Sequence, residues 1–146
     1  SQGIKEKFVQ CNLSRNEKRS TLRGLHFQAK PHEEGKLIRC IKGSIYDVIV
    51  DIRPESSTFL RWLGIELKAE SSNQLYIPAG FAHGFQTLED STEIFYQMSE
   101  FYSPDSSGGI LWNDPELEIN WPLSNPIISS KDRSYVELAD RRFEDG

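Results

Sequence analysis

The sequence predicts an all-β sandwich or barrel, because short apolar segments alternate with turn residues along most of the chain. About eight stretches rich in β-branched and aromatic residues are separated by clusters of Gly, Pro, Asp and Ser. No segment shows the 3.6-residue period of a long amphipathic helix, and no internal repeat or linker divides the chain. Its 146 residues therefore suit a single domain, residues 1–146, with room for a pocket between its sheets or in its mouth.

The expected strands share a β-forming composition and are bounded by turn signals. They span residues 8–13, 21–28, 36–41, 45–52, 59–67, 74–77, 81–88 and 92–101. The fourth has the clearest β pattern. The second contains Gly24, and a glycine inside a strand often marks a bulge or a close backbone approach. Residues 14–20 are expected to form a polar loop, and the tail, residues 129–143, one short helix.

The composition argues against disorder and contains no membrane segment. Hydrophobic residues make up 37% of the chain and aromatic residues 11%, which is enough for a packed core. No apolar run approaches the roughly 20 residues of a membrane helix, and the first residues are polar rather than signal-like. Cys11 and Cys40 lack metal-ligand spacing and fit a reducing compartment, so we expect a cytoplasmic protein without a membrane partner.

Charge is distributed unevenly along the chain. The formal net charge is −5, yet residues 1–30 hold seven basic and two acidic side chains. General nucleic-acid binding usually needs a basic face over the whole module, so the acidic remainder argues against it. The basic segment is compatible with one small anionic ligand, such as a diphosphate, and equally with a solvated arm.

The candidate chemistry centres on His26, one of three histidines in the chain. If the strands on either side of residues 29–35 form a simple hairpin, His26 and Lys36 are diagonal neighbours on one face, roughly 7–8 Å apart. Tyr96 alternates onto an apolar face of the last expected strand. Each residue also has a plainer role: a packed histidine, a solvated lysine, a core tyrosine. Asp132, near the polar tail, would ordinarily be a turn residue or a helix cap.

A series of motifs between residues 10 and 132 carries more information than any single residue. In order they are Arg23-Gly-Leu-His-Phe-Gln, Lys36-Leu-Ile-Arg, Gly43, Asp47-Val, Ile77-Pro-Ala-Gly-Phe-Ala-His-Gly-Phe85, Tyr96, Tyr102, Trp112-Asn-Asp-Pro, Ile119-Asn-Trp-Pro122 and Ser130-Lys-Asp132. Together they resemble the dTDP-4-dehydrorhamnose 3,5-epimerase family. The resemblance implies a cupin-type β-barrel or jelly roll, usually a homodimer. It also implies that the substrate is a dTDP-linked 4-keto-6-deoxy sugar, epimerised without a metal or organic cofactor.

The resemblance implies four catalytic residues whose types suit enolate chemistry. A ketone at C4 acidifies the hydrogens on C3 and C5, so a base can remove one and an acid can return a proton with inversion. By resemblance His26 is the base and Asp132 orients it, as a carboxylate orients imidazole in a triad. Lys36 stabilises the oxyanion at O4, and Tyr96 is the acid on the opposite face.

The resemblance also implies a substrate-binding set. Arg23, Gln10 and Asn12 hold the diphosphate and nucleotide, Tyr102 adds an aromatic surface, and His83 lines the pocket. Family members usually carry a longer N-terminus, with an additional strand that helps to bind the nucleotide of a partner subunit. The sequence begins at Ser1 without that strand, so we expect it to be absent.

Other functions remain open from the sequence. Pro78-x-Gly-x-x-His83 matches the second motif of a metal-dependent cupin enzyme. The ligands of such a site would be His26, His32, Glu33 or Glu34, and His83. Against a metal, the first motif normally has two histidines one residue apart, whereas Phe27 and Gln28 follow His26. A sugar-nucleotide binding module without turnover is a third class. Within the enzyme class, a C3-only epimerase and a 3,4-ketoisomerase share the same early chemistry.

Overall fold

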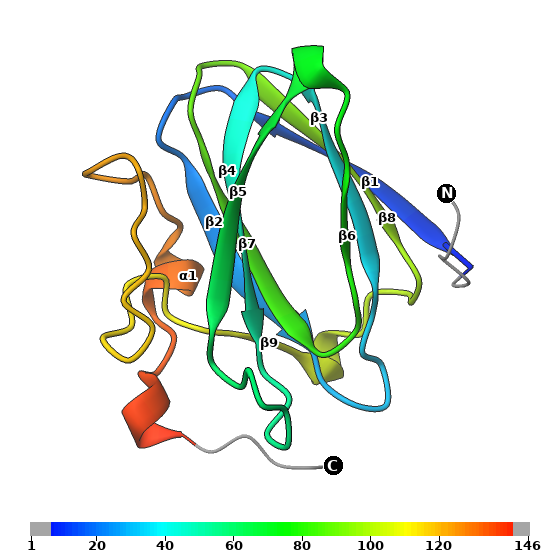
Figure 1. The fold of residues 1–146 in the computed structure, drawn as a ribbon, viewed down its shortest axis with the longest axis vertical. Helices are drawn as coiled ribbons and strands as arrows, with labels where there is room; N and C mark the ends of the chain where they lie inside the picture. The colour runs from blue at the N-terminus through cyan, green and yellow to red at the C-terminus, as the bar shows by residue number, and fades with distance from the viewer. Residues whose placement is uncertain (1–6, 142–146) are drawn as a thin grey trace.

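Two antiparallel sheets stacked face to face form the protein in the computed structural model, which describes residues 7–141 (Figure 1). The four-stranded sheet has the order β1-β8-β3-β6, and the five-stranded sheet has the order β5-β4-β7-β2-β9. The strands are β1 (Gln10–Asn16), β2 (Leu22–Gln28), β3 (Lys36–Lys42), β4 (Ser44–Asp51), β5 (Trp62–Lys68), β6 (Leu75–Ile77), β7 (Phe81–Thr87), β8 (Thr92–Met98) and β9 (Ser107–Gly109).

The predicted all-β class is confirmed, with differences at the ends of elements. Every expected strand is present, but β1 continues through residues 14–16, where a polar loop was expected, because this segment pairs with β8. The strand β9 was not expected, since its Ser-Gly-Gly sequence has no β-forming side chain. It exists through its pairing with β2. The tail contains the single-turn helix α1 (Ser130–Arg133) and a 3-10 turn at Leu138–Asp140, and residues 142–143 of the expected helix lie outside the described residues.

Helical structure elsewhere is confined to two further 3-10 turns, at Ala69–Ser71 and Pro104–Ser106, among the described residues. Within residues 7–141, no helix is both long and apolar enough to span a membrane.

Two apolar cores lie on the two faces of the five-stranded sheet, because alternate residues of β4 point to opposite sides. Ile45 faces the four-stranded sheet and joins a core with Ile38 and Phe85. Val48 and Val50 face the other way. They are covered by the C-terminal segment, drawn in yellow to red in Figure 1, which contributes Ile110, Leu117 and Leu138. The tail is therefore part of the folded domain and brings Asp132 close to β2.

The expected hairpin between the second and third strands is wrong. β2 pairs with β7 and β9 in one sheet, whereas β3 pairs with β6 and β8 in the other. Residues 29–35 cross from one sheet to the other, a step of about 10 Å between packed sheets. His26 and Lys36 are consequently not neighbours on one face but project from opposing sheets toward a shared interior.

Gly24 confirms the expectation of a bulge or close approach in the second strand. Its φ is +119°, and a Cβ there would lie 2.7 Å from the Cα of Gly84 on β7. The register between β2 and β7 shifts between Arg23 and His26. Only glycine permits this approach, since an L side chain would be strained by the backbone angle and would collide with β7.

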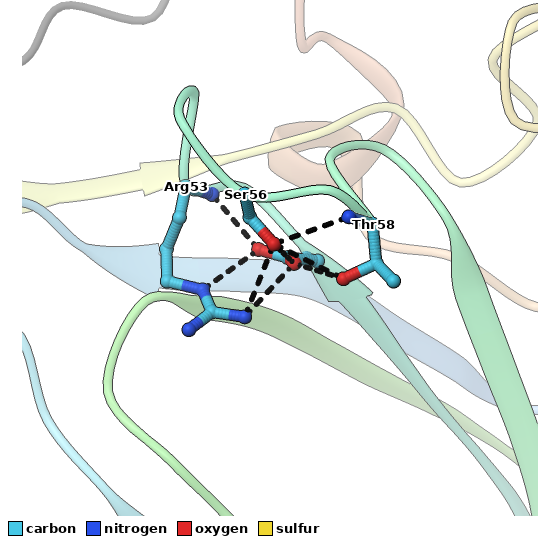
Figure 2. A network of polar contacts seen from close by, with 4 residues as sticks. Arg53, Ser56 and Thr58 are labelled. Carbon is cyan, nitrogen blue, oxygen red and sulfur yellow. Dashed lines mark hydrogen bonds and ion pairs between the residues drawn. The ribbon is translucent and has the colours of Figure 1, made fainter.

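A polar network closes the connection between β4 and β5 (Figure 2). Asp51 accepts hydrogen bonds from the Arg53 side chain, two at 3.0 Å, and from the hydroxyls of Ser56 and Thr58. Burial acts to raise the pKa of Asp51, but these donors outweigh it and hold the pKa far below its ordinary value. The Arg53 guanidinium also lies 4.9 Å from the ring centre of Phe81, the first residue of β7. The network therefore anchors the start of the strand that carries His83.

Candidate active site

A cavity of about 390 Å³ lies between the two sheets. Strands β1, β3 and β8 contribute to its wall from one sheet, and β2 and β9 from the other. The lining residues are Gln10, Asn12, His26, Phe27, Gln28, Glu34, Lys36, Tyr96, Met98, Tyr102, Ser107 and Lys131. Polar groups thus converge on a partly apolar pocket, which is the usual composition of a small-molecule site.

His26 and Asp132 form a hydrogen-bonded pair at one wall of this cavity. Nε2 of His26 lies 2.8 Å from Oδ1 of Asp132, and the side chains are 44% and 6% exposed, respectively. The backbone N–H of Gly24 donates to the other carboxylate oxygen of Asp132 at 3.0 Å. Asp132 itself is fixed on α1, where its N–H donates to the capping Ser129 hydroxyl at 3.1 Å. The buried carboxylate therefore holds an imidazole whose other edge reaches the cavity.

The electrostatics of the pair define the tautomer of His26. Burial acts to raise the pKa of Asp132, but hydrogen bonds from His26, Gly24 and Tyr135 lower it below its ordinary value. Asp132 is therefore a carboxylate at neutral pH and can only accept hydrogen bonds. Nε2 of His26 must carry the shared proton, so Nδ1 is the unprotonated nitrogen of the neutral imidazole. That nitrogen is available as a base.

Tyr96 lines the cavity from β8, on the sheet opposite His26. Burial raises its pKa above the ordinary value for tyrosine, and the negative charge of Asp47 raises it further. The phenol therefore keeps its proton through the neutral range. Its ring meets the ring of His83 edge-on, with centroids 6.3 Å apart. A protonated phenol and an imidazole base thus face one cavity from opposing walls.

Lys36 provides a cation at the β3 wall. Its Nζ lies 3.6 Å from Oε1 of Glu34, and the two side chains are 15% and 13% exposed. Burial lowers the pKa of Lys36, while the charges of Glu34 and Asp47 oppose that effect. Burial likewise raises the pKa of Glu34, and Lys36 opposes the rise. The two residues stabilise each other's charged form inside the cavity.

His83 belongs to a second histidine–carboxylate pair, behind the cavity wall. Its Nε2 lies 2.5 Å from Oδ1 of Asp47, and the two side chains are 5% and 0% exposed. Burial lowers the pKa of His83, and Asp47 opposes the effect. Oδ2 of Asp47 is buried with no hydrogen-bond partner among the described residues. His83 was expected to line the pocket. It is not among the lining residues, although its ring contacts that of Tyr96, which is.

The remaining expected binding residues separate into two groups. Gln10, Asn12 and Tyr102 lie in the cavity lining. The N–H of Tyr102 donates to Oε1 of Gln10 at 3.0 Å, so β1 and the segment after β8 meet at this end of the cavity. Arg23 lies outside the lining, with its Nε donating to Oδ1 of Asn16 at 2.7 Å.

Sequence reasoning did not assign roles to Lys131, Tyr135 or the Glu34–Lys36 pair. Lys131 lines the cavity and immediately precedes Asp132, so its motif could have indicated it. Glu34 lies two residues before Lys36, a spacing that puts side chains on one side of an extended chain. Tyr135 has no comparable signal, because its position depends on contacts with β9 and α1.

Metal ligation requires several donors to converge on one point. Among residues 7–141, no group of three His, Cys, Asp or Glu side chains is placed to hold an ion. Two of the potential ligands named from the sequence, His26 and His83, each bond a separate carboxylate. The donor set therefore does not fit the metal-dependent cupin alternative.

Comparison with known proteins gives a consistent result. The dTDP-4-dehydrorhamnose 3,5-epimerase family matches this chain over residues 1–140. A protein of that name from Shigella flexneri is 50% identical over 141 residues, which cover 97% of this chain and 77% of the relative. The predicted resemblance is therefore confirmed.

Solved structures agree in fold as well as in sequence. The dTDP-4-dehydrorhamnose 3,5-epimerase of Bacillus anthracis, with TDP and PPi bound, has a TM-score of 0.91 at 49% identity and covers 93% of this chain and 78% of its own. The dTDP-6-deoxy-D-glucose-3,5-epimerase of Legionella pneumophila, in complex with dTDP-4-keto-L-rhamnose, has a TM-score of 0.88 at 41% identity, with coverages of 94% and 72%. These similarities confirm the cupin-type jelly roll. With the family match over nearly its whole length, the chain belongs to the dTDP-4-dehydrorhamnose 3,5-epimerase family.

Proposed function

We propose that this protein inverts C3 and C5 of a dTDP-linked 4-keto-6-deoxyhexose, with His26 as base and Tyr96 as acid. Membership of the family makes the chain a carbohydrate epimerase. The observation that carries the residue assignment is the placement of an imidazole–carboxylate pair and a protonated phenol on opposing sheets around one cavity. Inversion needs a base and an acid on opposite faces of the sugar ring, and the position of these two groups on opposing walls supports that division.

The first step is proton abstraction by Nδ1 of His26. The C–H bond at C3 or C5 breaks, its electrons move toward the C4 ketone, and an enolate forms. The imidazolium produced faces the Asp132 carboxylate, which stabilises the new positive charge through the existing hydrogen bond. Gly24 and the helix cap keep the carboxylate in place, so little reorganisation is required.

The second requirement is stabilisation of the enolate oxygen. Lys36 lines the cavity from β3, and its ammonium is assigned to O4 in this proposal. The charges of Glu34 and Asp47 favour the protonated form of Lys36 against burial. A neutral amine could not stabilise the oxyanion by charge. The carboxylates that favour the ammonium form of Lys36 therefore contribute to the proposed catalysis.

The third step returns a proton from the opposite face. The Tyr96 O–H bond breaks, its proton passes to the carbanionic carbon, and the C4 ketone re-forms with inverted configuration at the adjacent centre. The phenolate then regains a proton from solvent, and His26 releases the one it abstracted. The raised pKa of Tyr96 keeps the acid loaded before each turnover.

The nucleotide part of the substrate would occupy the end of the cavity formed by β1. Gln10 and Asn12 offer amide groups, Tyr102 an aromatic ring that is 58% exposed, and Lys131 a cation for a phosphate. Arg23 would join this set by leaving its contact with Asn16 when an anion binds.

A homodimer is proposed with this function. The outer face of the four-stranded sheet carries apolar and aromatic side chains, including Phe95 and Leu13, which is 45% exposed. The edge strand β1 is also unpaired on its outer side among the described residues, and a second chain would cover both features. Light scattering at micromolar concentration should give twice the 16.8 kDa chain mass. A monomer mass would refute the dimer.

A cytoplasmic location is proposed on the cysteines. Cys11 and Cys40 are both free thiols, one exposed and one buried, and free thiols persist most readily in a reducing compartment.

The deciding experiment is incubation with dTDP-4-keto-6-deoxyglucose in deuterated water, followed by proton NMR. We expect deuterium to enter at C3 and C5 and both centres to invert. Exchange and inversion at C3 alone would assign a C3-only epimerase, and migration of the keto group would assign a 3,4-ketoisomerase. Binding without any exchange would reduce the protein to a sugar-nucleotide binding module and refute the proposal.

A further inference from the structure

Tyr135 lies against the His26–Asp132 pair although it is not part of the cavity lining. It follows α1 by two residues, and its ring meets the His26 ring edge-on, with centroids 6.3 Å apart and an interplanar angle of 77°. The same ring rests directly on the backbone of Gly109, where any Cβ would overlap it. Gly109 is itself the residue paired with His26 across β2 and β9. Because Gly109 has no side chain, the Tyr135 ring can lie beside the His26 imidazole.

The hydroxyl of Tyr135 interacts with the Asp132 carboxylate. Burial and the negative charge of Asp132 raise the pKa of Tyr135 to about 12. The phenol is therefore protonated throughout the neutral range and donates its hydrogen to the carboxylate. Asp132 then receives donors from three directions: the imidazole, the Gly24 N–H and the phenol. The three donors leave the carboxylate little freedom to rotate.

We propose that Tyr135 is a positioning residue, whose ring fixes the plane of the His26 imidazole and whose hydroxyl shares the charge of Asp132. The inference rests on the assignment of His26 as the base. The His26 side chain is 44% exposed and borders the cavity, so the ring contact with Tyr135 restrains its rotation. The hydroxyl has a second effect. By donating a hydrogen bond, it reduces the negative charge on the carboxylate. Asp132 then stabilises the protonated form of His26 less strongly.

The groups that face the pair are relevant to any pH effect. On the cavity side these are Lys36, Glu34, Tyr96, Tyr102 and Lys131. Behind the wall, His83 interacts electrostatically with His26, and Arg141 with Tyr135. Tyr135 contacts His26 through its ring and Asp132 through its hydroxyl, so its replacement can be separated from general changes in the electrostatic field.

The test uses two substitutions at this position and a matched control. Tyr135→Phe keeps the ring on Gly109 and removes the hydroxyl, whereas Tyr135→Ala removes both. Tyr46→Phe is the control, because Tyr46 also packs edge-on against a ring, that of Trp121 at 6.4 Å, on the far side of the five-stranded sheet. Each variant is checked by circular dichroism and thermal unfolding before kinetics.

The two variants should give different signatures. Tyr135→Ala should lower kcat roughly 10- to 100-fold with KM within about twofold, as expected for a misplaced base. Tyr135→Phe should keep kcat within about threefold but move the acid limb of the kcat/KM profile to higher pH by roughly half a unit. The shift is toward higher pH because Asp132, with one hydrogen-bond donor fewer, stabilises the His26 imidazolium more strongly. Tyr46→Phe should change neither quantity.

A second readout does not depend on turnover. The ring Nε2–H of His26 gives a ¹⁵N-resolved NMR signal that is protected by its bond to Asp132 and is readily assigned in a chain with three histidines. It should persist in Tyr135→Phe and broaden by water exchange in Tyr135→Ala. If the wild-type protein failed to exchange substrate protons, the proposed function would be refuted. The Nε2–H signal would still show whether Tyr135 positions His26.

The proposal is overturned by wild-type kcat in Tyr135→Ala together with an unaltered Nε2–H signal. It is also overturned if the acid limb of Tyr135→Phe coincides with that of the wild type. Should Tyr135→Ala fail to fold, the Tyr135→Phe profile decides the outcome. Equal losses in Tyr46→Phe would show a general effect of removing the hydroxyl of a partly buried tyrosine, again against a positioning role.

Discussion

Replacing Asp132 with asparagine changes the charge at the catalytic pair while preserving its shape. The amide oxygen introduced by Asp132→Asn can still accept from the Gly24 N–H or from His26, and α1 keeps its Ser129 cap. What disappears is the negative charge 2.8 Å from Nε2 of His26. The imidazolium formed during proton abstraction then loses its counter-charge, and the amide NH₂ competes to invert the tautomer. We therefore expect slower turnover in a folded protein.

The size of the effect follows from exposure. Two unit charges about 4 Å apart interact by about 4 kcal/mol at an effective dielectric constant near 20. Because the His26 side chain is 44% exposed, water screens part of this, and about 2–3 kcal/mol remains. At 1.36 kcal/mol per factor of ten, kcat should fall roughly 30- to 150-fold. This is less than the ~10⁴-fold loss for the equivalent change in a serine protease, where the aspartate–histidine pair is buried.

The assay follows loss of the C3 and C5 proton signals in deuterated water under saturating substrate. Asp140→Asn, which alters an exposed carboxylate on the same C-terminal segment, is the matched control and should retain wild-type kcat. Thermal unfolding should show that both variants fold. If Asp132→Asn were within threefold of the wild type, Asp132 would be a structural residue of the tail, and the dyad assignment would be wrong.

Three further outcomes are expected. Tyr96→Phe should still admit deuterium at C3 or C5 with the original configuration, while inverted product falls sharply. Near wild-type inversion would place the acid elsewhere. Chelator treatment should leave kcat unchanged; loss of activity that one divalent ion per chain restores would favour the metal-dependent cupin. Asp51→Asn should lower the free energy of unfolding by roughly 2–3 kcal/mol at pH 7. Since the folded pKa of Asp51 is depressed, its stabilisation exists above the unfolded value near 4 and is lost as pH falls. The variant should flatten that acid-side decline in urea titrations, and an unchanged pH dependence would contradict the anchoring role of the network in Figure 2.

Strand positions could be predicted because alternation is a local property. The pattern in β4, for example, sends Val48 and Ile45 to different cores. Pairing is not local, and this explains the errors in the fold, including the continuation of β1 through residues 14–16. The Ser-Gly-Gly of β9 is a strand only because β2 lies beside it. Residues 29–35 resemble a hairpin loop, yet they connect two sheets, since β2 and β3 each find other partners.

The candidate site could be predicted where its residues belong to recognisable sequence motifs. Their order brought His26, Asp132, Tyr96 and Lys36 into consideration, and the structure gathers them at one cavity or its immediate wall. Tyr135 was missed because its role depends on the absence of a side chain at Gly109. Neither residue suggests the other in sequence, and only the pairing of β9 with β2 places them together.

The two histidine–carboxylate pairs show how environment divides similar residues between different tasks. His26 and His83 are paired across β2 and β7, and each bonds a carboxylate through Nε2. The His83 side chain is only 5% exposed, and burial lowers its pKa. His26 lies beyond the Gly24 bulge, which shifts the register and leaves its ring open to the cavity. An imidazole that must exchange protons with substrate and solvent needs that opening. Burial lowers the pKa of Lys36 and raises that of Tyr96, and the buried pair contributes Asp47, whose charge favours the protonated form of both. In the proposed mechanism the half-exposed pair performs the proton transfer, and the buried pair favours the protonation states that the transfer requires.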